Sequence, residues 1–476
     1  MANEQLKKII LMKWPELDQI DDSFLSLIDG WEQWYQGSVS KFHRYTVYNG
    51  HKRIPVKRYG LGMAKKLCED MANMLFNERC QILVDDKPTD DYLHAIFDNN
   101  NLWVKINELQ ELKSAYGTVA IVPYVSGLNV TESGTIVGGG EIKFNYLTAK
   151  DFIPIRWNNG TIEGILFGNK YSKGKHVYLY VQKIDKEEDI YYTENLLFDV
   201  SDKNVREVPL ETIAELESVP PRVVNGPVKP FVIDRLNMTN NVDRWNPMGL
   251  PIFANSIDVL MGLDIAYDSY INEFILGRKR IFVNEDLIRQ HNADGTVVEY
   301  FDNTDVVFQK LPTGYKNEST QENDIVEIDM HIRAQEHNDA LDKYLNLLGS
   351  KCGMGERFYS WQSSGVKTAT EVISENSNLY RSLKKHEIIL DAVIVDFCNI
   401  VLDMAANFIQ VPNIKTDANI TVRFDDSIIQ DKVSERNQDM IDVGAGIMSP
   451  AEYRAKWYSE TIEQAKANIP ANPEVD

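Results

Sequence analysis

The sequence predicts an α+β fold, in which long helices alternate with separate groups of strands. Over residues 368–411 apolar side chains recur at steps of three, four or seven, which is the period of an α-helix. Over residues 117–197 the apolar period is two, and Gly, Asn and Asp turns separate the segments, as in an antiparallel meander. A second group of short strands, at about residues 281–328, lies between two further helical segments.

The longest predicted helix begins at Thr368. Thr368 and Glu371 have the spacing of a capping box, in which the hydroxyl and the carboxylate each satisfy a backbone N–H at the helix start. No proline or glycine follows until Pro412. At 1.5 Å per residue this helix would be about 60 Å long. A helix of that length suggests a coiled coil, a repeat or a strut in a large assembly.

Composition indicates a globular protein with several cores. The chain has 476 residues, 43% of them hydrophobic and 25% charged, so two to four folding units are expected. The net charge of -21 argues against tight, sequence-independent attachment to a polyanion, because such binding needs clusters of Lys and Arg. It does not exclude a nucleic acid that passes without being held.

Compartment signals predict an intracellular protein. The first residues show no signal peptide, and no apolar run approaches the ~20 residues of a membrane helix. The four cysteines lie far apart and form no C-x-x-C pair, so they are predicted to be reduced and mostly buried thiols.

Residues 1 to about 115 are predicted to be mainly helical. One helix begins at Asp21-Asp22-Ser23 and ends at Gly37, and another lies within residues 59–77, where Met and Leu form an apolar stripe. A basic cluster at residues 52–58 lies between them. A nucleic-acid contact and a solvated loop or subunit contact are both open for it, and the second is the commoner role of such clusters.

The strand block contains two glycine or proline signals. Gly138-Gly139-Gly140 matches no phosphate-binding pattern and is predicted to be a flexible hairpin. Pro220-Pro221, after an acid-rich stretch, predicts a boundary.

Two helices flank the second group of strands. The first is predicted over residues 252–276 with Gly277 as its C-cap, and the second covers residues 330–348. Between them Asp294-Gly295 predicts a hairpin turn.

A glycine-rich segment with aromatic residues joins the helix at 330–348 to the longest helix. Gly349, Gly353 and Gly355 precede three aromatic residues in a polar stretch that ends at the capping box. We predict a flexible loop, and this is the most function-like feature of the chain because ligand contacts concentrate on such loops.

The carboxyl-terminal part is predicted to be one strand followed by helices. The strand covers residues 420–424, Asp425-Asp426 leads into a helix that ends near Val443, and Ser449 caps a further helix opened by Pro450. The tail after Ile469 is predicted to be disordered.

No pattern of catalytic residues is present. The chain has no G-x-S-x-G, H-E-x-x-H, kinase or Walker pattern. His331 and His337 come closest to metal spacing, but six positions place them on different helix faces. Asp425-Asp426 could hold a divalent ion, although a carboxylate cap explains its place before a helix. The sequence therefore predicts no catalytic site, no cofactor and no metal centre.

The order of these segments resembles the portal proteins of tailed bacteriophages, in particular the portal family of long-tailed phages of Gram-positive bacteria. Nearly the whole chain takes part, and the resemblance is carried by local stretches in this order: residues 64–70 with 73–78, residues 272–283, residues 368–372 with Asn376 and Tyr380-Arg381, and residues 445–449 with Glu452-Tyr453.

The resemblance implies a portal fold with named parts. These are an α/β wing at residues 1–250, with its β meander at about 117–197, a two-helix stem at 251–277 and 329–350, a small α/β clip at 278–328, a tunnel loop at 351–367, a long wing-to-crown helix at 368–411 and a helical crown at 412–476.

It also implies a function in the virion. Family members form a ring, usually of twelve subunits, at one capsid vertex, and double-stranded DNA passes through its channel without sequence-specific contacts. The implied partners are the major capsid and scaffolding proteins, the terminase large subunit that drives packaging, and a head-completion adaptor. Assembly would occur in the host cytoplasm, with no membrane partner.

Candidate contact residues follow from the same resemblance. Those of the tunnel loop are Arg357, Phe358, Tyr359, Trp361, Gln362, Ser363, Ser364 and Lys367. Those of the clip are Arg278, Lys279 and Arg280. Arg357 and Lys367 are candidates for transient phosphate contact, and the aromatic residues could pack between neighbouring loops or touch the duplex. Packing is the interpretation we favour.

Two other functions remain open from the sequence. One is a soluble carboxylate-dependent enzyme, such as a hydrolase, whose site lacks a known pattern. The other is a scaffold or adaptor of a different complex. The mass of the particle in solution separates both from a large ring.

Overall fold

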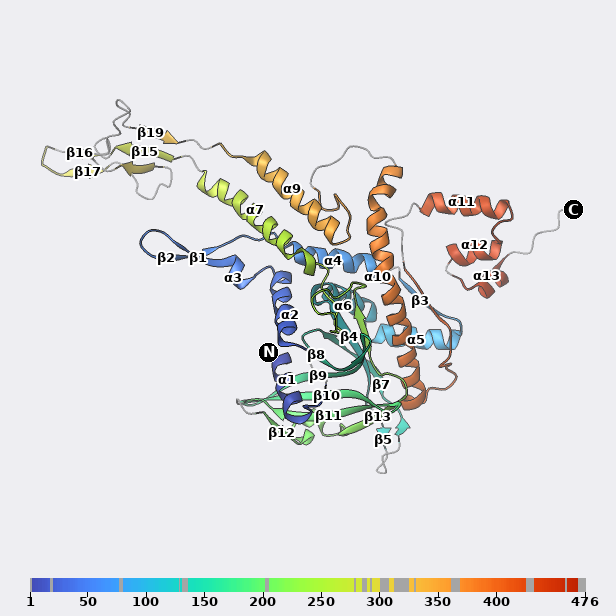
Figure 1. Cartoon of the computed structure of the whole chain (residues 1–476). Coiled ribbons are helices and arrows are strands. Elements are labelled where there is room, and N and C mark those ends of the chain that lie inside the picture. Colours follow the sequence, from blue (N-terminus) through green and yellow to red (C-terminus); the bar gives the residue numbers. More distant parts are fainter. Residues whose placement is uncertain are drawn as a thin grey trace.

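A computed structural model of the chain shows helices and sheets arranged around one large body (Figure 1). The residues that it describes are 2–17, 20–76, 80–127, 129–130, 136–201, 205–277, 280–284, 289–291, 293–299, 308–311, 325–328, 331–360, 369–424, 432–458 and 460–469. This mixture of helix and sheet confirms the predicted α+β class.

The amino-terminal part of the body is mainly helical, as predicted. Its elements are α1 (Ala2–Lys13), α2 (Asp22–Tyr35), α3 (Ser40–His43), β1 (Arg44–Tyr48), β2 (Arg53–Lys57), α4 (Met63–Leu75), β3 (Gln81–Val84), α5 (Lys87–Asn99) and α6 (Leu102–Tyr116). The predicted start of α2 is confirmed, because the Asp21 carboxylate accepts a hydrogen bond of 2.7 Å from the Ser23 N–H. The basic cluster at 52–58 is not a loop, because most of it forms strand β2.

The predicted strand block forms two main antiparallel sheets rather than one meander. The first has the order β14-β4-β7, from β4 (Thr118–Ser126), β7 (Glu141–Thr148) and β14 (Val232–Arg235). The second has the order β12-β11-β10-β9-β8 with β13 also on β11, from β8 (Phe152–Asn158), β9 (Thr161–Lys173), β10 (His176–Glu187), β11 (Ile190–Asp199), β12 (Arg206–Val208) and β13 (Arg222–Gly226).

Two short strands, one glycine signal and one proline signal complete this block. β5 (Asn129–Val130) pairs with β6 (Ile136–Gly138), and Gly139 and Gly140 follow with positive φ. The predicted glycine hairpin is wrong, because these glycines join β6 to β7, which pairs with β4 and not with β6. The predicted boundary at Pro220-Pro221 is wrong, because β13 immediately after it returns to β11 and β14 then pairs with β4. Short 3-10 turns lie at Leu210–Thr212 and Ala214–Leu216.

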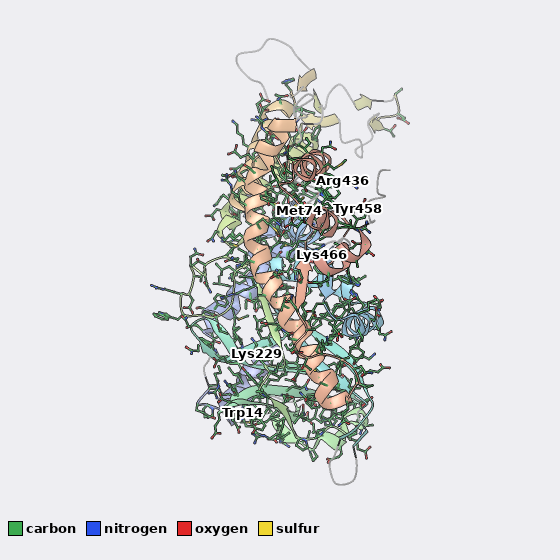
Figure 2. All side chains as sticks on the ribbon, turned by 90° about the vertical axis from the view of Figure 1, so that its right-hand side faces the viewer. Trp14, Met74, Lys229, Arg436, Tyr458 and Lys466 are labelled. Carbon is green, nitrogen blue, oxygen red and sulfur yellow. The ribbon has the colours of Figure 1, made fainter. Side chains whose placement is uncertain are left out.

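The longest helix, α10 (Ala369–Met404), confirms the main helical prediction. It continues into a π-helical turn at Ala405–Ile409, just before Pro412. Figure 2 shows it crossing most of the length of the molecule, with Trp14 near one end of the body and Arg436 beside its other half. Its apolar side packs into the core, where the Phe397 ring lies 4.9 Å from Phe144. The predicted capping box at Thr368 lies outside the described residues.

Two helices lead from the body to a small β unit (Figure 1). α7 (Ile257–Leu276) follows a 3-10 turn at Ala254–Ser256, and α9 (Ala334–Lys351) begins four residues later and ends three residues later than predicted. Gly277 is the C-cap of α7, although its φ of −76° is not left-handed.

The described residues of the small β unit form five short strands. These are β15 (Arg280–Asn284), β16 (Arg289–His291), β17 (Val297–Glu299), β18 (Phe308–Leu311) and β19 (Ile325–Ile328). β15 pairs with β18 and β19, and β16 pairs with β17. The hairpin predicted at Asp294-Gly295 is confirmed, with φ of 81° at Gly295.

The carboxyl-terminal part is linked to the amino-terminal part by a strand pair. β20 (Ile420–Arg423) pairs with β3, which the sequence did not indicate. α11 (Lys432–Gly444), α12 (Pro450–Trp457) and α13 (Ile462–Asn468) follow, and Ser449 caps α12 in a full capping box with Glu452. Asp425-Asp426 and the tail after Ile469 lie outside the described residues.

Candidate functional site

The connection between α9 and α10 begins with a compact turn rather than a flexible loop. After α9 the chain doubles back, and two backbone hydrogen bonds hold it: Cys352 N–H to Leu348 O at 3.0 Å and Met354 N–H to Gly349 O at 2.9 Å. Cys352 and Met354 are buried, and burial raises the pKa of the Cys352 thiol to about 11. The thiol therefore stays protonated at neutral pH.

Glycine is needed in this turn for close approach. A Cβ at Gly349 would lie 2.6 Å from the Gly355 carbonyl oxygen. A Cβ at Gly353, whose φ is +79°, would lie 2.3 Å from the Ser382 hydroxyl on α10. These glycines let the turn pack tightly, so the prediction of flexibility from them is wrong for residues 352–360.

The two described aromatic residues of the connection have different surroundings. Tyr359 is half-buried, and its hydroxyl donates a hydrogen bond of 3.0 Å to Asp70 on α4. Burial, with the Asp70 charge, raises the pKa of Tyr359. Phe358 is 39% exposed, and its ring packs edge-on against Tyr359 at 4.8 Å. Within one subunit Tyr359 is thus an anchor, while Phe358 can contact something outside the chain.

Polar anchors fix the end of the turn on α9. The Arg357 N–H donates to Asn346 Oδ1 at 3.0 Å, and Ser360 Oγ donates to Asp342 Oδ1 at 2.8 Å. The Arg357 side chain is exposed. The other predicted contact residues of this connection lie outside the described residues: Trp361, Gln362, Ser363, Ser364 and Lys367.

The helices α7 and α9 approach each other closely at Gly262. A Cβ at Gly262 would lie 2.6 Å from the Tyr344 ring, so only glycine allows this helix contact. Further along, Glu273 accepts hydrogen bonds from Arg333 Nε at 3.0 Å and Nη2 at 2.8 Å. His337 Nε2 lies 3.4 Å from the same carboxylate. The Arg333 guanidinium lowers the pKa of Glu273 to about 2.

This ion cluster ties the two helices together where the small β unit begins. It also gives His337 a role other than the metal ligand considered with His331. In the β unit, Arg280 lies in β15 opposite Ile328. Arg278 and Lys279 lie outside the described residues.

A second polar cluster lies inside the body and was not predicted. The Lys113 ammonium on α6 lies 3.1 Å from both carboxylate oxygens of Asp234 on β14, and Gln110 Nε2 donates to the same carboxylate at 2.7 Å. All three side chains are buried. Burial lowers the pKa of Lys113, although Asp234 opposes the change.

His386 on α10 extends this cluster. Its Nδ1 accepts a hydrogen bond of 3.0 Å from the Asn237 N–H, and burial together with the Lys113 charge lowers its pKa to about 3. The imidazole is therefore neutral at ordinary pH. No local pattern marks these residues, because their partners come from distant parts of the sequence.

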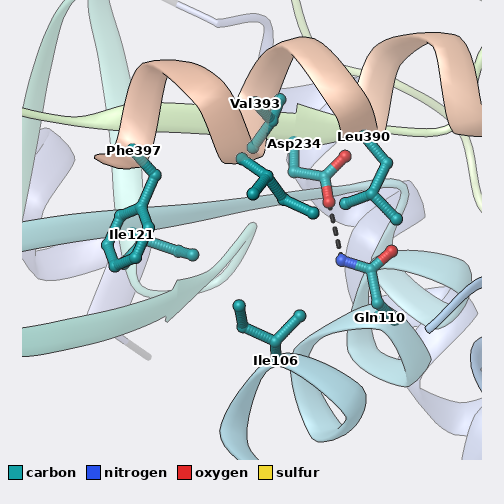
Figure 3. Close-up of a pocket in the computed structure, with 8 residues that line it drawn as sticks. Ile106, Gln110, Ile121, Asp234, Leu390, Val393 and Phe397 are labelled. Atoms are coloured by element: carbon teal, nitrogen blue, oxygen red, sulfur yellow. Dashed lines mark hydrogen bonds between the residues drawn. The ribbon is translucent and has the colours of Figure 1, made fainter. Parts of the chain in front are cut away.

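The cavity beside this cluster is too small for a substrate. It lies between α6, β4, β14 and α10, and Figure 3 shows Leu390, Val393 and Phe397 on its α10 side, with the Gln110–Asp234 hydrogen bond at its edge. Its volume is about 10 Å³, which is room for roughly one water molecule. Gln110 Oε1 is buried without a partner there, so a water molecule would satisfy it.

The described residues contain neither a metal-binding cluster nor a membrane-spanning helix. No group of three or more His, Cys, Asp or Glu side chains within them is arranged to hold a metal ion. Among the helices so described, none is long and apolar enough to cross a bilayer. The four cysteines are free and buried, as predicted.

Comparison with known proteins assigns the chain to a family. A search of curated proteins gives no match. Among solved structures, a similar chain comes from a "Virion of native gene transfer agent (GTA) particle", with a TM-score of 0.42 and 11% identity over 95% of this chain and 98% of that chain. The family model "Phage portal protein, SPP1 Gp6-like" matches residues 16–469. The chain belongs to this phage portal protein family.

Proposed function

We propose that the chain forms a ring of about twelve subunits at one vertex of a capsid and acts there as the conduit for double-stranded DNA. DNA enters during packaging, driven by a separate terminase, and leaves during ejection, and the ring is also the platform on which head and tail join. The observation that carries this proposal is the family match over residues 16–469, nearly the whole chain.

The geometry supports a division of roles within the ring. α7 and α9 serve as the stem, and the strands β15–β19 serve as the clip that meets the adaptor or the terminase, through contacts that include Arg278, Lys279 and Arg280. The anchored turn at 352–360 holds the start of a tunnel loop that extends to residue 367. Arg357 and Lys367 make transient phosphate contacts, and the aromatic residues pack between neighbouring loops.

Charge supports a channel that does not retain DNA. The net charge of -21 makes the ring repel phosphate, so the duplex slides without being held. The absence of a catalytic pattern in the sequence fits a conduit whose ATPase is another protein.

Light scattering after size exclusion tests the ring. Twelve chains of 54.5 kDa give a particle of about 0.65 MDa (12 × 54.5 kDa). A monodisperse monomer or dimer under all conditions of salt, concentration and divalent cation would contradict the proposal.

The loop role has its own test. Lys367→Ala, or deletion of residues 361–367, leaves ring assembly intact and lowers the amount of DNA packaged per head. Normal DNA filling by heads that carry the deletion variant would refute the role of the loop without affecting the ring.

A further inference from the structure

One segment of this acidic protein contains no acidic residue. Residues 33–68 carry eight Lys or Arg and no Asp or Glu, whereas 71 acidic residues among 476 would place about five in a segment of this length. Subtracting its +8 from the net charge of -21 leaves -29 for the rest of the chain. This segment is therefore opposite in charge to the rest of the protein.

The centre of the segment is the β1–β2 hairpin. The two strands pair only with each other among the described strands. Figure 1 shows the hairpin projecting from the body below α7, toward the same side as the stem and the small β unit. Five residues per strand give an arm of about 17 Å at roughly 3.4 Å per residue.

The base of the hairpin is fixed rigidly to α7. His43 Nε2 lies 3.0 Å from Asp264 Oδ2, both side chains are buried, and the Leu61 N–H donates to the other oxygen of Asp264 at 2.8 Å. A Cβ at Gly60 would lie 3.0 Å from the same His43 nitrogen. The direction of the arm is therefore set by the stem helix.

Arg58, which directly follows β2, packs against residues at the start of the hairpin. Its guanidinium lies 4.2 Å from the Phe42 ring centre and 4.9 Å from that of Tyr45, and it donates to the Phe42 carbonyl at 2.7 Å. Arg58 is thus used within the subunit, and the Lys57 ammonium lies 5.8 Å from the centre of the Tyr59 ring.

The pairing of the strands gives the arm one basic face. Alternation along each strand places Arg44 and Tyr48 of β1 on the same face as Arg53 and Lys57 of β2. Arg44 lies directly opposite Lys57, and like charges in such a pair destabilise an isolated hairpin. In the part of the chain that the structure describes, these three cations make no ion pair. Tyr48 is 65% exposed.

The β1–β2 hairpin would be stabilised by contact with a negatively charged surface. A two-stranded hairpin alone in water is at best marginally stable. Addition of a further strand to β2 is disfavoured because Pro55 has no N–H to donate. Docking through side chains, with carboxylates between Arg44 and Lys57, removes the repulsion and covers Tyr48.

We infer that the basic face of the β1–β2 hairpin, formed by Arg44, Tyr48, Arg53 and Lys57, docks on the acidic surface of a second copy of this chain. The inference rests on the proposed ring, in which another copy lies beside each subunit. A second copy presents a charge of -29 outside residues 33–68, which complements the arm. Duplex DNA is disfavoured as occupant, because the same charge repels phosphate brought to the base of the arm.

The test is a charge reversal with a matched control. The variant carries Arg44→Glu, Arg53→Glu and Lys57→Glu, and the control carries Lys170→Glu, Lys175→Glu and Lys466→Glu, which change the net charge by similar amounts at exposed sites elsewhere. Thermal melting of each purified monomer shows that both are folded. We expect the variant to need at least tenfold more protein than the control for half-maximal ring assembly, measured by light scattering.

Cross-linking shows where the arm docks. A zero-length carbodiimide reagent joins Lys52 or Lys57 to a carboxylate, and rings assembled from equal parts of ¹⁴N and ¹⁵N protein reveal whether the two peptides come from different chains. Mixed-isotope cross-links are expected. Cross-links confined to one chain would overturn the inference.

The outcomes separate the inference from the proposed function. Absence of rings from the unmodified protein would defeat the ring itself. Equal assembly of variant and control would defeat only the docking of the arm. Normal rings of the variant with reduced retention of duplex DNA would assign the arm to nucleic acid and overturn the inference.

Discussion

The body and the α7/α9 helix pair, which is the proposed stem, are stabilised in different ways. The body surrounds α10 with a continuous apolar core and encloses the fully buried ion pair Lys113–Asp234. In the stem, α7 packs against α9 along one side of each helix. At the end far from the body, the partly exposed ion pair between Glu273 and Arg333 joins the two helices. The ends of α7 and α9 nearest the body share its core through Leu263 and Leu345, while the far end of α7 leaves apolar surface exposed.

The stem also exposes apolar side chains at its far end. The last turns of α7 expose Phe274, Ile275 and Leu276, with Leu276 58% exposed. Such a cluster on a soluble protein marks an interaction surface. In the proposed ring these residues would be covered by neighbouring stems, so assembly would stabilise the stem more than the body.

The largest loss of stability is expected for a substitution in the body. Asp234→Ala leaves the Lys113 ammonium buried without its counter-charge and removes the acceptor of Gln110. Breaking a buried pair in this way typically costs about 3–5 kcal/mol. Urea unfolding of the monomer measures the free energy of unfolding.

The control for this prediction removes both charges. Lys113→Met with Asp234→Leu should recover most of the loss, because no uncompensated charge remains. A loss for Asp234→Ala below about 1 kcal/mol would show that the buried pair does not stabilise the body and would weaken the contrast with the stem.

A smaller effect is expected at the turn between stem and body. Gly353→Ala places a Cβ 2.3 Å from the Ser382 hydroxyl and at a positive φ, so we expect destabilisation of about 1–3 kcal/mol. Gly446→Ala is the matched control, because its φ is +72° with open space around it. Equal losses in the two variants would show that the close approach to α10 is not important.

The pH dependence of the body should change with His386. Its pKa is about 3 in the folded chain against an ordinary 6.5, so below pH 6.5 the unfolded chain binds a proton that the folded chain does not. Stability from this group is complete above about pH 6.5 and falls as the pH drops toward 3. His386→Asn keeps an acceptor for the Asn237 N–H and removes this dependence.

The expected change is a shallower slope of unfolding free energy against pH. One proton corresponds to a slope of at most about 1.4 kcal/mol per pH unit. Urea unfolding of both proteins between pH 4 and 8 measures it. Parallel curves would contradict a buried neutral His386.

The smallest effect is expected in the stem. Glu273→Gln should leave the melting temperature of the body unchanged and speed amide exchange in the last turn of α7 and the first turn of α9. The ionised Glu273 contributes fully above its ordinary pKa of 4.5, and that contribution is lost only as the pH falls through about 2. Glu336→Gln, on the first turn of α9, is the control. Unchanged exchange in both variants would show that the cluster does not hold the helices.

The sequence predicted features that depend on neighbouring residues. The length of α10, the Ser449 cap of α12, the start of α2 and the turn at Asp294-Gly295 are each encoded within a few residues. Local periodicity and cap chemistry are enough for these, because no distant partner decides them.

Features that depend on distant partners were not predictable. The pairing of β20 with β3 joins segments more than three hundred residues apart, and Lys113 meets Asp234 across two elements. The glycines at 349 and 353 indicated mobility by composition, whereas the structure uses them for close packing. The candidate contacts that the structure describes also differ in their surroundings, because Tyr359 is bonded to Asp70 whereas Phe358 and Arg357 are exposed.

Negative-stain imaging of the purified full-length chain tests the central proposal most directly. Class averages recorded over a series of salt and magnesium concentrations should show closed rings with rotational symmetry and a central channel, at a mass of about 0.65 MDa (12 × 54.5 kDa). Particles that never exceed a dimer in any of these conditions, or open filaments without a channel, would contradict a portal ring.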